Sequence, residues 1–214
     1  MSTVADVFIG NLARSEAVAT PYRHWLMDEV LPADIARALD TIDIPMGEGH
    51  DYGGRRECNN SLRAFFTPER QAENSAVAAV AEALRDSRTI AAIETTTGCD
   101  LAGSLLRIEY CQDGDGFWLE PHTDIGAKRF TLLCYLSAGE GSDGCGTDIF
   151  DRDRRWVRTV PFRFNSALVF VPGPDTWHGF NRRTIVGVRR TMIVNYVTPD
   201  WRARQELAFP APVR

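Results

Sequence analysis

Hydrophobic positions divide the chain into two stretches of different periodicity. Before about residue 100, apolar residues recur at the three- and four-residue spacing of amphipathic helices, as at Val77, Val80 and Leu84. After that point, short apolar runs alternate with clusters of Gly, Pro and Asp, which is typical of strands and turns. The pattern therefore predicts a helical N-terminal part of about residues 1–100 and a β-rich core of about residues 101–198.

Start signals for helices lie within the N-terminal part. Pro32 suits the first turn of one predicted helix. Thr67 can cap another helix, with Pro68 at its first position and the Ala-rich run 76–84 beyond it. The intervening segment Gly47–Asn60 is rich in Gly, Asn and charged residues, which predicts a loop long enough to act as a lid or to face a substrate.

The β-rich part contains six segments with the composition and length of strands. These segments are Leu105–Tyr110, Arg129–Leu136, Thr147–Asp151, Trp156–Val160, Ala167–Val171 and Thr191–Val197. Short strands separated by turn residues indicate a β-sandwich or barrel, and helices gathered at one end of the chain are expected to pack on one of its sheets. The expected fold class is therefore α+β, in a single domain over residues 1–214.

Composition narrows the function classes. An apolar fraction of 44% and a charged fraction of 25% are ordinary for a globular protein, and the net charge of -5 predicts no general attraction to nucleic acid or anionic membranes. The sequence shows neither an apolar run of membrane-spanning length nor the basic and apolar pattern of a signal peptide, so we expect a cytoplasmic location. Five cysteines without a CxxC pair argue against a disulfide framework or a cysteine-rich zinc site.

Three residues of the β-rich part form a candidate metal site. His122 and Asp124 lie two positions apart, so an extended backbone points both side chains to the same face. His178 follows a predicted strand and a turn, whereas His24 and His50 lie in the helical part. Taken singly, each histidine has a plainer interpretation as a turn or core residue. Together, two neutral imidazoles and a carboxylate can hold iron(II) on one face and leave three positions open for a 2-oxo acid and dioxygen.

The far carboxylate of a chelated 2-oxo acid needs a fixed cation, and Arg189 and Arg190 compete for that role. Alternation along the predicted strand places Arg189, Thr191, Ile193 and Asn195 on one face and Arg190, Met192, Val194 and Tyr196 on the other. The first face is more polar and suits a cavity, whereas the second is more apolar and suits packing against the N-terminal helices. Alternation therefore favours Arg189.

The segment 105–198 resembles the core of the iron(II)/2-oxoglutarate-dependent oxygenases. The His-x-Asp…His pattern of that family matches the three candidate metal ligands, and its Gly-x-Arg-x-Ser/Thr segment matches Gly187–Thr191. In prolyl-hydroxylase-like members a strand of the form Thr-x-Ile/Leu-x-Tyr-Leu follows the first motif, and here it stands as Thr131–Leu136. The resemblance covers just under half of the chain and does not include the first hundred residues.

The resemblance implies a double-stranded β-helix core, which is a jelly-roll or cupin-like fold, with iron(II), 2-oxoglutarate and O2 as cofactor and co-substrates. It assigns the metal ligands as His122, Asp124 and His178, and the 2-oxoglutarate contacts as Arg189, Tyr135 and Thr191. The implied reaction hydroxylates an unactivated C–H bond while 2-oxoglutarate is decarboxylated to succinate. Halogenation is disfavoured, because Asp124 fills the position that a halide needs.

The identity of the substrate stays open at this stage. We expect a small metabolite, with neither nucleic acid nor a membrane as partner. One alternative is a cupin-type barrel that binds a divalent metal without 2-oxoglutarate chemistry, because the same ligands suit several metals. A second alternative is a hydroxylase that acts on a protein or peptide. An ordinary strand position is also an alternative interpretation of Thr191.

Overall fold

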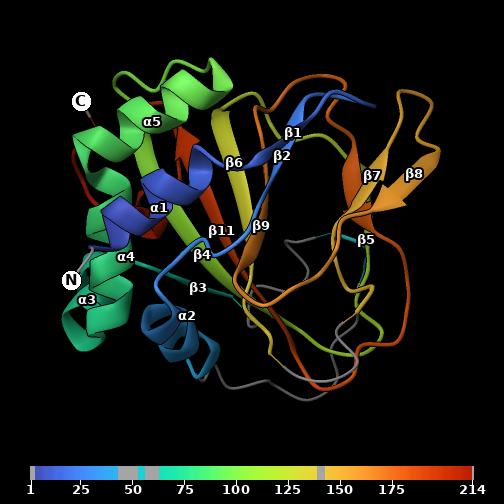
Figure 1. Cartoon of the computed structure of the whole chain (residues 1–214), viewed down its shortest axis with the longest axis horizontal. Helices are drawn as coiled ribbons and strands as arrows, with labels where there is room; N and C mark the ends of the chain where they lie inside the picture. The colour runs from blue at the N-terminus through green and yellow to red at the C-terminus, as the bar shows by residue number, and fades with distance from the viewer. Residues whose placement is uncertain (1–2, 43–52, 56–62, 139–142, 214) are drawn as a thin grey trace.

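The computed structural model describes residues 3–42, 53–55, 63–138 and 143–213. In these parts a seven-stranded sheet and a four-stranded sheet lie opposite each other, and helices cover the outer face of the larger sheet (Figure 1). Strand pairing is antiparallel in both sheets. The predicted α+β fold, a double-stranded β-helix with N-terminal helices packed on one sheet, is thereby confirmed.

The larger sheet has the order β1–β2–β9–β6–β11–β4–β3, and the smaller sheet has the order β5–β10–β7–β8. The strands of the larger sheet are β1 Glu16–Val18, β2 His24–Met27, β9 Ser166–Phe170, β6 Lys128–Tyr135, β11 Arg189–Val197, β4 Leu105–Asp113 and β3 Arg63–Phe65. Those of the smaller sheet are β5 Leu119–His122, β10 His178–Phe180, β7 Asp148–Phe150 and β8 Trp156–Thr159. The helices are α1 Val4–Leu12, α2 Ala33–Asp40, α3 Pro68–Glu73, α4 Ser75–Arg85, α5 Ser87–Thr97 and a 3-10 turn at Arg204–Glu206.

The N-terminal part contributes strands as well as helices, which the hydrophobic pattern does not predict. β1 and β2 extend one edge of the larger sheet beyond β9, and β3 forms the other edge beside β4. Each of these strands spans only three or four residues, too few for an alternating pattern to stand out. The short strands β5 and β10 are missing from the predicted set for the same reason. The predicted Gly47–Asn60 loop lies mostly outside the described residues.

Local capping explains where the N-terminal helices begin and end. The Thr67 hydroxyl accepts a hydrogen bond from the Arg70 amide, and α3 begins at Pro68 as predicted. The Asn74 side chain accepts from two amides of the next turn and so starts α4, which contains the predicted Ala-rich run. α5 ends at Thr97 and is capped by Gly98, whose φ of 79° lies in the left-handed region that glycine adopts without steric cost.

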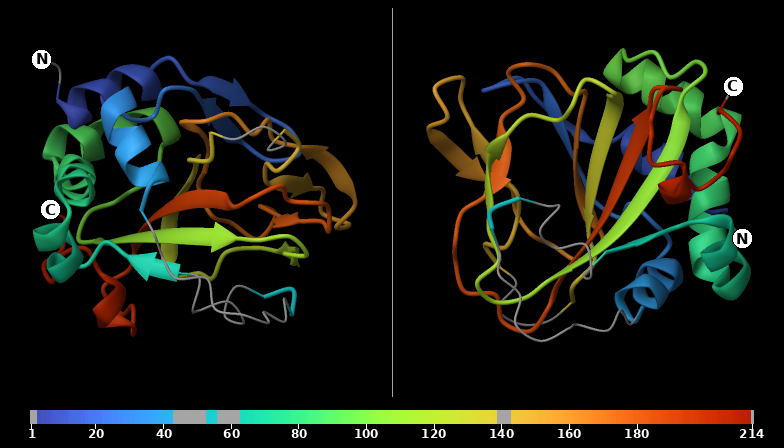
Figure 2. Two further views of the ribbon diagram at one scale, coloured as in Figure 1. Left: turned by 90° about the horizontal axis from the view of Figure 1, so that it is seen from below. Right: turned by 180° about the vertical axis from the view of Figure 1, so that it is seen from behind.

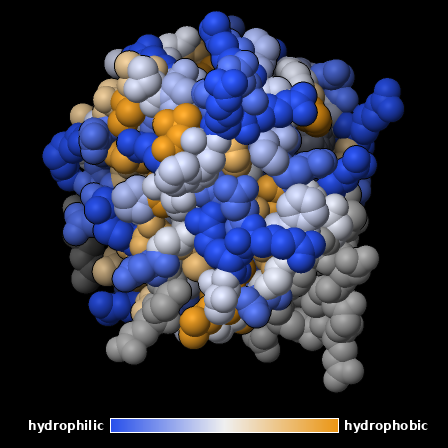
Figure 3. Space-filling view, turned by 90° about the vertical axis from the view of Figure 1, so that its right-hand side faces the viewer, coloured by the Kyte–Doolittle hydropathy of each residue, from blue (hydrophilic) through white to orange (hydrophobic). Residues whose placement is uncertain are grey.

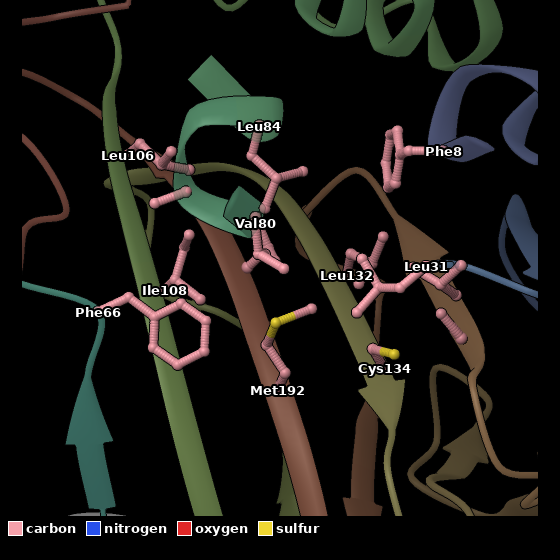
Figure 4. Packing of buried hydrophobic residues seen from close by; sticks show 14 of the residues in the cluster. Phe8, Leu31, Phe66, Val80, Leu84, Leu106, Ile108, Leu132, Cys134 and Met192 are labelled. Carbon is pink, nitrogen blue, oxygen red and sulfur yellow. The ribbon is translucent and has the colours of Figure 1, made fainter. Parts of the chain in front are cut away.

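The main hydrophobic core lies between the helices and the larger sheet. Figure 4 shows Val80 and Leu84 of α4 over Ile108 of β4 and Met192 of β11. Met192, Val194 and Tyr196 all belong to this core, whereas Ile193 belongs to a second cluster between the two sheets. The predicted division of β11 into a helix-facing side and an interior side is therefore confirmed.

The chain ends and one face of the surface are visible in the overall views. Both chain termini lie on the helical side in all views (Figures 1 and 2). Seen from the side of the smaller sheet, the surface is mainly hydrophilic, with scattered hydrophobic residues (Figure 3). Among the described helices, none has the length and apolarity needed to cross a membrane.

The core between α4 and β4 yields a test of the packing. Ile108 is fully buried there, and Ile108→Ala removes three carbon atoms without a side chain free to refill the space. We expect a loss of about 2–5 kcal/mol in the free energy of unfolding, measured by urea denaturation. Val186→Ala is the matched control, because Val186 is 62% exposed, and its effect should stay within about 0.5 kcal/mol. Equal losses in both variants would contradict the placement of Ile108.

Candidate metal centre and co-substrate pocket

Two histidines distant in sequence meet across neighbouring strands. His122 ends β5 and His178 begins β10, and the antiparallel register places them directly opposite each other. Their ring centroids lie 4.4 Å apart. Gly179 allows the close approach, because a Cβ at this position would lie 2.9 Å from the Leu119 carbonyl oxygen. The sheet therefore brings together the two histidines that the sequence proposes as metal ligands.

Backbone carbonyls orient both imidazoles. The Nδ1 atom of His122 lies 2.8 Å from the Glu120 carbonyl oxygen, and that of His178 lies 2.9 Å from the Thr176 carbonyl oxygen. Since a carbonyl only accepts, each Nδ1 carries a hydrogen, so in the neutral form of each ring Nε2 has the lone pair. Metal-binding histidines are oriented by this type of hydrogen bond.

Electrostatics set the protonation states of two candidate ligands, Asp124 and His178. Burial raises the pKa of the Asp124 carboxyl, but Lys128 and His178 outweigh it, and the pKa falls to about 2. Burial and the neighbouring His122 lower the pKa of His178 to about 4. At neutral pH the site therefore offers a carboxylate and a neutral imidazole, the forms that bind a metal cation.

Asp124 is engaged by neighbouring side chains. Its Oδ1 accepts from Lys128 Nζ at 2.5 Å, and its Oδ2 accepts from the Thr131 hydroxyl at 2.6 Å. Across the described residues, no three His, Cys, Asp or Glu side chains are grouped closely enough to hold an ion. His122, Asp124 and His178 nevertheless line one cavity, and two imidazoles with a carboxylate are donors of the kind that bind divalent cations. A metal at Oδ1 would displace the Lys128 ammonium.

The cavity beside these residues has a volume of about 190 Å³ and lies along the interior face of β4, β6 and β11. Its inner end, where Arg189 pairs with Asp113 in the β4–β11 register, is lined by Thr147, Phe180 and Arg189. Its outer end, where Asn195 pairs with Arg107, is lined by Arg107 and Trp201. Leu133, Ile193 and Glu109 share one row of the sheet between these two ends.

Arg189 and Arg190 lie on opposite sides of the larger sheet. Arg189 lines the cavity, with Nε donating to the Cys145 carbonyl at 2.7 Å and Nη1 to Asp113 at 2.6 Å. Its guanidinium lies 4.7 Å from the centroid of the Phe180 ring. Arg190 points to the helical side, where it lies 3.7 Å from Asp40. Of the two arginines, only Arg189 is positioned to meet a ligand in this cavity.

Tyr135 and Thr191 lie beside Arg189 on the interior face. The two residues are direct partners in the β6–β11 register. The Tyr135 hydroxyl donates to the Thr147 hydroxyl at 2.9 Å, and Thr147 lines the cavity. Within the described chain, the buried Thr191 hydroxyl has no hydrogen-bond partner. The three side chains that the sequence proposes as co-substrate contacts are therefore close neighbours.

Sequence reasoning missed a row of charged residues on the cavity wall. Arg107 and Glu109 occupy alternate positions of β4 and face the interior beside Asn195 and Ile193 of β11. Glu109 accepts from Arg63 of the edge strand β3 at 2.5 Å. The alternation of Arg107 and Glu109 was visible in the sequence. Polar residues at every second position of an apolar strand indicate that its interior face is part of a site.

Comparison with a family model agrees with this geometry. Residues 106–198 match the model of the 2OG-Fe(II) oxygenase superfamily. This match begins in β4 and ends just after β11, so it includes all six predicted site residues. No curated protein matches the chain.

Solved structures with similar folds include hydroxylases and an epimerase. A prolyl-4-hydroxylase from Pseudomonas putida is 16% identical with a TM-score of 0.59, over 91% of this chain and 98% of that chain. A 2OG complex of the viral collagen prolyl hydroxylase from Paramecium bursaria Chlorella virus-1 is 14% identical with a TM-score of 0.54, over 82% and 96% of the two chains. The non-heme alpha-ketoglutarate-dependent epimerase SnoN of nogalamycin biosynthesis is 16% identical with a TM-score of 0.51, over 98% and 95%. At these identities the similarity concerns the fold.

Proposed function

We propose that this chain, a member of the 2OG-Fe(II) oxygenase superfamily through its residues 106–198, is a hydroxylase that binds iron(II) through His122, Asp124 and His178. The observation that carries the proposal is the pairing of the two histidines across β5 and β10, at a cavity that also contains Asp124 and Arg189. Fe(II), 2-oxoglutarate and O2 are the cofactor and co-substrates of this superfamily.

Iron(II), when bound, supplies the coordination of the oxo acid and the activation of dioxygen, which side chains alone do not provide. The protein supplies orientation. The Glu120 and Thr176 carbonyls fix the two imidazoles with Nε2 available for coordination. The negative charge of Asp124 completes the ligand set. No side chain has to act as a general acid or base in this scheme.

The inner end of the cavity suits the far carboxylate of 2-oxoglutarate. Arg189 supplies the cation there, and Asp113 and the Cys145 carbonyl hold its guanidinium in place. The Thr191 hydroxyl is buried on the same face of β11, and a ligand carboxylate is an acceptor of the kind it lacks. Phe180 lines the same end, with its ring centroid 4.7 Å from the Arg189 guanidinium, so apolar surface shields the ion pair from water.

We assign a small metabolite as the substrate class. A cavity of about 190 Å³ is small compared with the ~300–1,000 Å³ of drug-sized ligand pockets, so little room remains beside the oxo acid. Arg63, Arg107 and Glu109 also line the cavity, which favours a polar substrate. A peptide hydroxylase remains the alternative, and competition between peptides and polar metabolites for substrate-stimulated succinate release separates the two.

The metal assignment predicts the behaviour of His178→Ala. Loss of one of two imidazoles should abolish iron-dependent formation of succinate from 2-oxoglutarate, because the remaining ligands hold the metal too weakly. Succinate release with purified protein and Fe(II) is the measurement, and circular dichroism monitors the fold.

His24→Gln is the control, since His24 of β2 is also buried and its Nδ1 contacts a backbone carbonyl, that of Tyr22. This control should retain turnover. Full activity in His178→Ala would remove His178 as a ligand. If the wild-type protein forms no succinate under any condition and binds zinc tightly, the metal-binding barrel without 2-oxoglutarate chemistry is the better description.

The opposite orientation of Arg189 and Arg190 predicts which of the two substitutions raises the KM for 2-oxoglutarate more. Arg189→Ala should raise the KM for 2-oxoglutarate roughly 10- to 100-fold, the equivalent of about 1.5–3 kcal/mol for a lost charged hydrogen bond. Arg190→Ala should raise it much less, because Arg190 faces the helices. Initial rates of succinate formation at varied 2-oxoglutarate give both values. The reverse ranking would rule out Arg189 as the anchor.

A further inference from the structure

A chain of side-chain hydrogen bonds connects a buried arginine to Asp124. Arg107 Nη1 donates to Asn195 Oδ1 at 3.3 Å, and Asn195 Nδ2 donates to Thr131 Oγ1 at 2.9 Å. The Thr131 hydroxyl donates in turn to Asp124 Oδ2 at 2.6 Å. Arg107, Thr131 and Asn195 are at most 4% exposed, so water does not compete for these bonds.

This hydrogen-bond relay runs from Arg107 through Asn195 and Thr131 to Asp124. The chemistry of its two ends fixes which atom donates in each hydrogen bond. A guanidinium only donates, so the amide oxygen of Asn195 must face Arg107 and its amide nitrogen must face Thr131. The same nitrogen also lies 3.4 Å from the Phe130 carbonyl, which only accepts and therefore agrees with this orientation. With its oxygen occupied as an acceptor, the Thr131 hydroxyl directs its single hydrogen to the Asp124 carboxylate.

Sheet register places the members of the relay side by side. Asn195 of β11 is the direct partner of Arg107 on β4 and of Thr131 on β6. The three residues therefore form one row across the central strands on the interior face. Asp124 itself lies outside the regular strands, between β5 and β6. The relay ties a carboxylate on an irregular segment to the most extensively paired strands of the sheet.

The start of the relay is held in place from several sides. Arg107 forms ion pairs with Glu109 at 2.7 Å and with Glu206 at 2.6 Å. Its guanidinium also lies 4.8 Å from the ring centroid of Phe65 and 5.3 Å from that of Trp201. Arg107 is thus fixed by charge and by stacking, and it presents a constant donor to Asn195.

We propose that Thr131 and Asn195 are positioning residues for Asp124: the relay delivers a hydrogen to Oδ2 and leaves Oδ1 as the oxygen that binds the metal. The inference rests on the proposed function, because it takes Asp124 as a metal ligand. A metal at Oδ1 would replace Lys128, whose ammonium lies 2.5 Å from that oxygen in this structure. Outer hydrogen bonds of this kind strengthen metal binding by fixing the ligand atom before the metal arrives.

Metal affinity of the purified full-length chain tests the relay without any turnover. Co(II) is the probe, and its d–d absorption band reports both the dissociation constant and the ligand geometry. Thr131→Val removes the hydroxyl at nearly constant shape and should weaken Co(II) binding roughly 10- to 100-fold. Thr131→Ser keeps the hydroxyl and should restore most of the affinity.

Asn195→Asp tests the direction of the relay. A carboxylate at this position accepts the Thr131 hydrogen and draws it away from Asp124, although Thr131 itself is unchanged. We expect Asn195→Asp to lose about as much Co(II) affinity as Thr131→Val. The double variant with both substitutions should lose no more than either alone, because both changes remove the same hydrogen bond. If Thr131→Val does not fold, Asn195→Asp carries the comparison alone.

Two control variants separate the relay from the metal site. Thr89→Val removes a fully buried threonine hydroxyl in α5 that has no hydrogen-bond partner among the described residues, so Co(II) affinity should stay unchanged. Asp124→Ala should abolish specific binding. If Asp124→Ala binds Co(II) like the wild type, the ligand set fails and the relay fails with it. If Asp124→Ala loses binding while Thr131→Val and Asn195→Asp keep wild-type affinity and spectra, the relay is overturned and the ligand set stands.

Discussion

The register of β11 between β4 and β6 is the constraint on which the interior of this protein depends. Side chains alternate along a strand, so a shift of one residue would exchange the helix-facing set for the interior set. In the observed register Met192 and Tyr196 enter the apolar core under the helices, while Arg189 and Asn195 enter the space between the sheets. The hydrophobic core therefore fixes the polar site, because the core cannot form in another register.

Buried charges in that interior are paired at close range. Arg189 is paired with Asp113, and Arg107 is paired with Glu109 and Glu206. Such pairs give little net stability, because removing charges from water costs about as much as their attraction returns. What they provide is a defined orientation of the charged side chains in the cavity, which suits the charged co-substrate proposed for it. This is consistent with their positions, which lie at the two ends of the cavity rather than within the apolar core.

Much of the site could be predicted because its signals are local in the sequence. The two-residue spacing of His122 and Asp124 and the alternation around Arg189 depend only on strand geometry. The fold class followed from the change of periodicity near residue 100. The assignment of iron and 2-oxoglutarate came from the family resemblance, which the family model supports.

The features of the fold and candidate site that the sequence did not predict depend on contacts between distant parts of the chain. The pairing of β5 with β10 joins short strands far apart in the chain, so its register was not accessible from periodicity. The interaction of Lys128 with Asp124 arises from the path of the irregular segment between β5 and β6. The role of Arg107 needed the register of three strands at once, although its alternation with Glu109 was visible in the sequence.

The placement of the short N-terminal strands has a consequence for how the molecule can be divided. β2 pairs with β9 on one side of the larger sheet, and β3 pairs with β4 on the other, so both outer strands of the family-matched segment have partners from outside it. A fragment limited to residues 106–198 would present the free N–H and C=O groups of two strand edges to solvent. Exposed edges of this kind template intermolecular pairing, so the segment that matches the family model is expected to need its flanking strands.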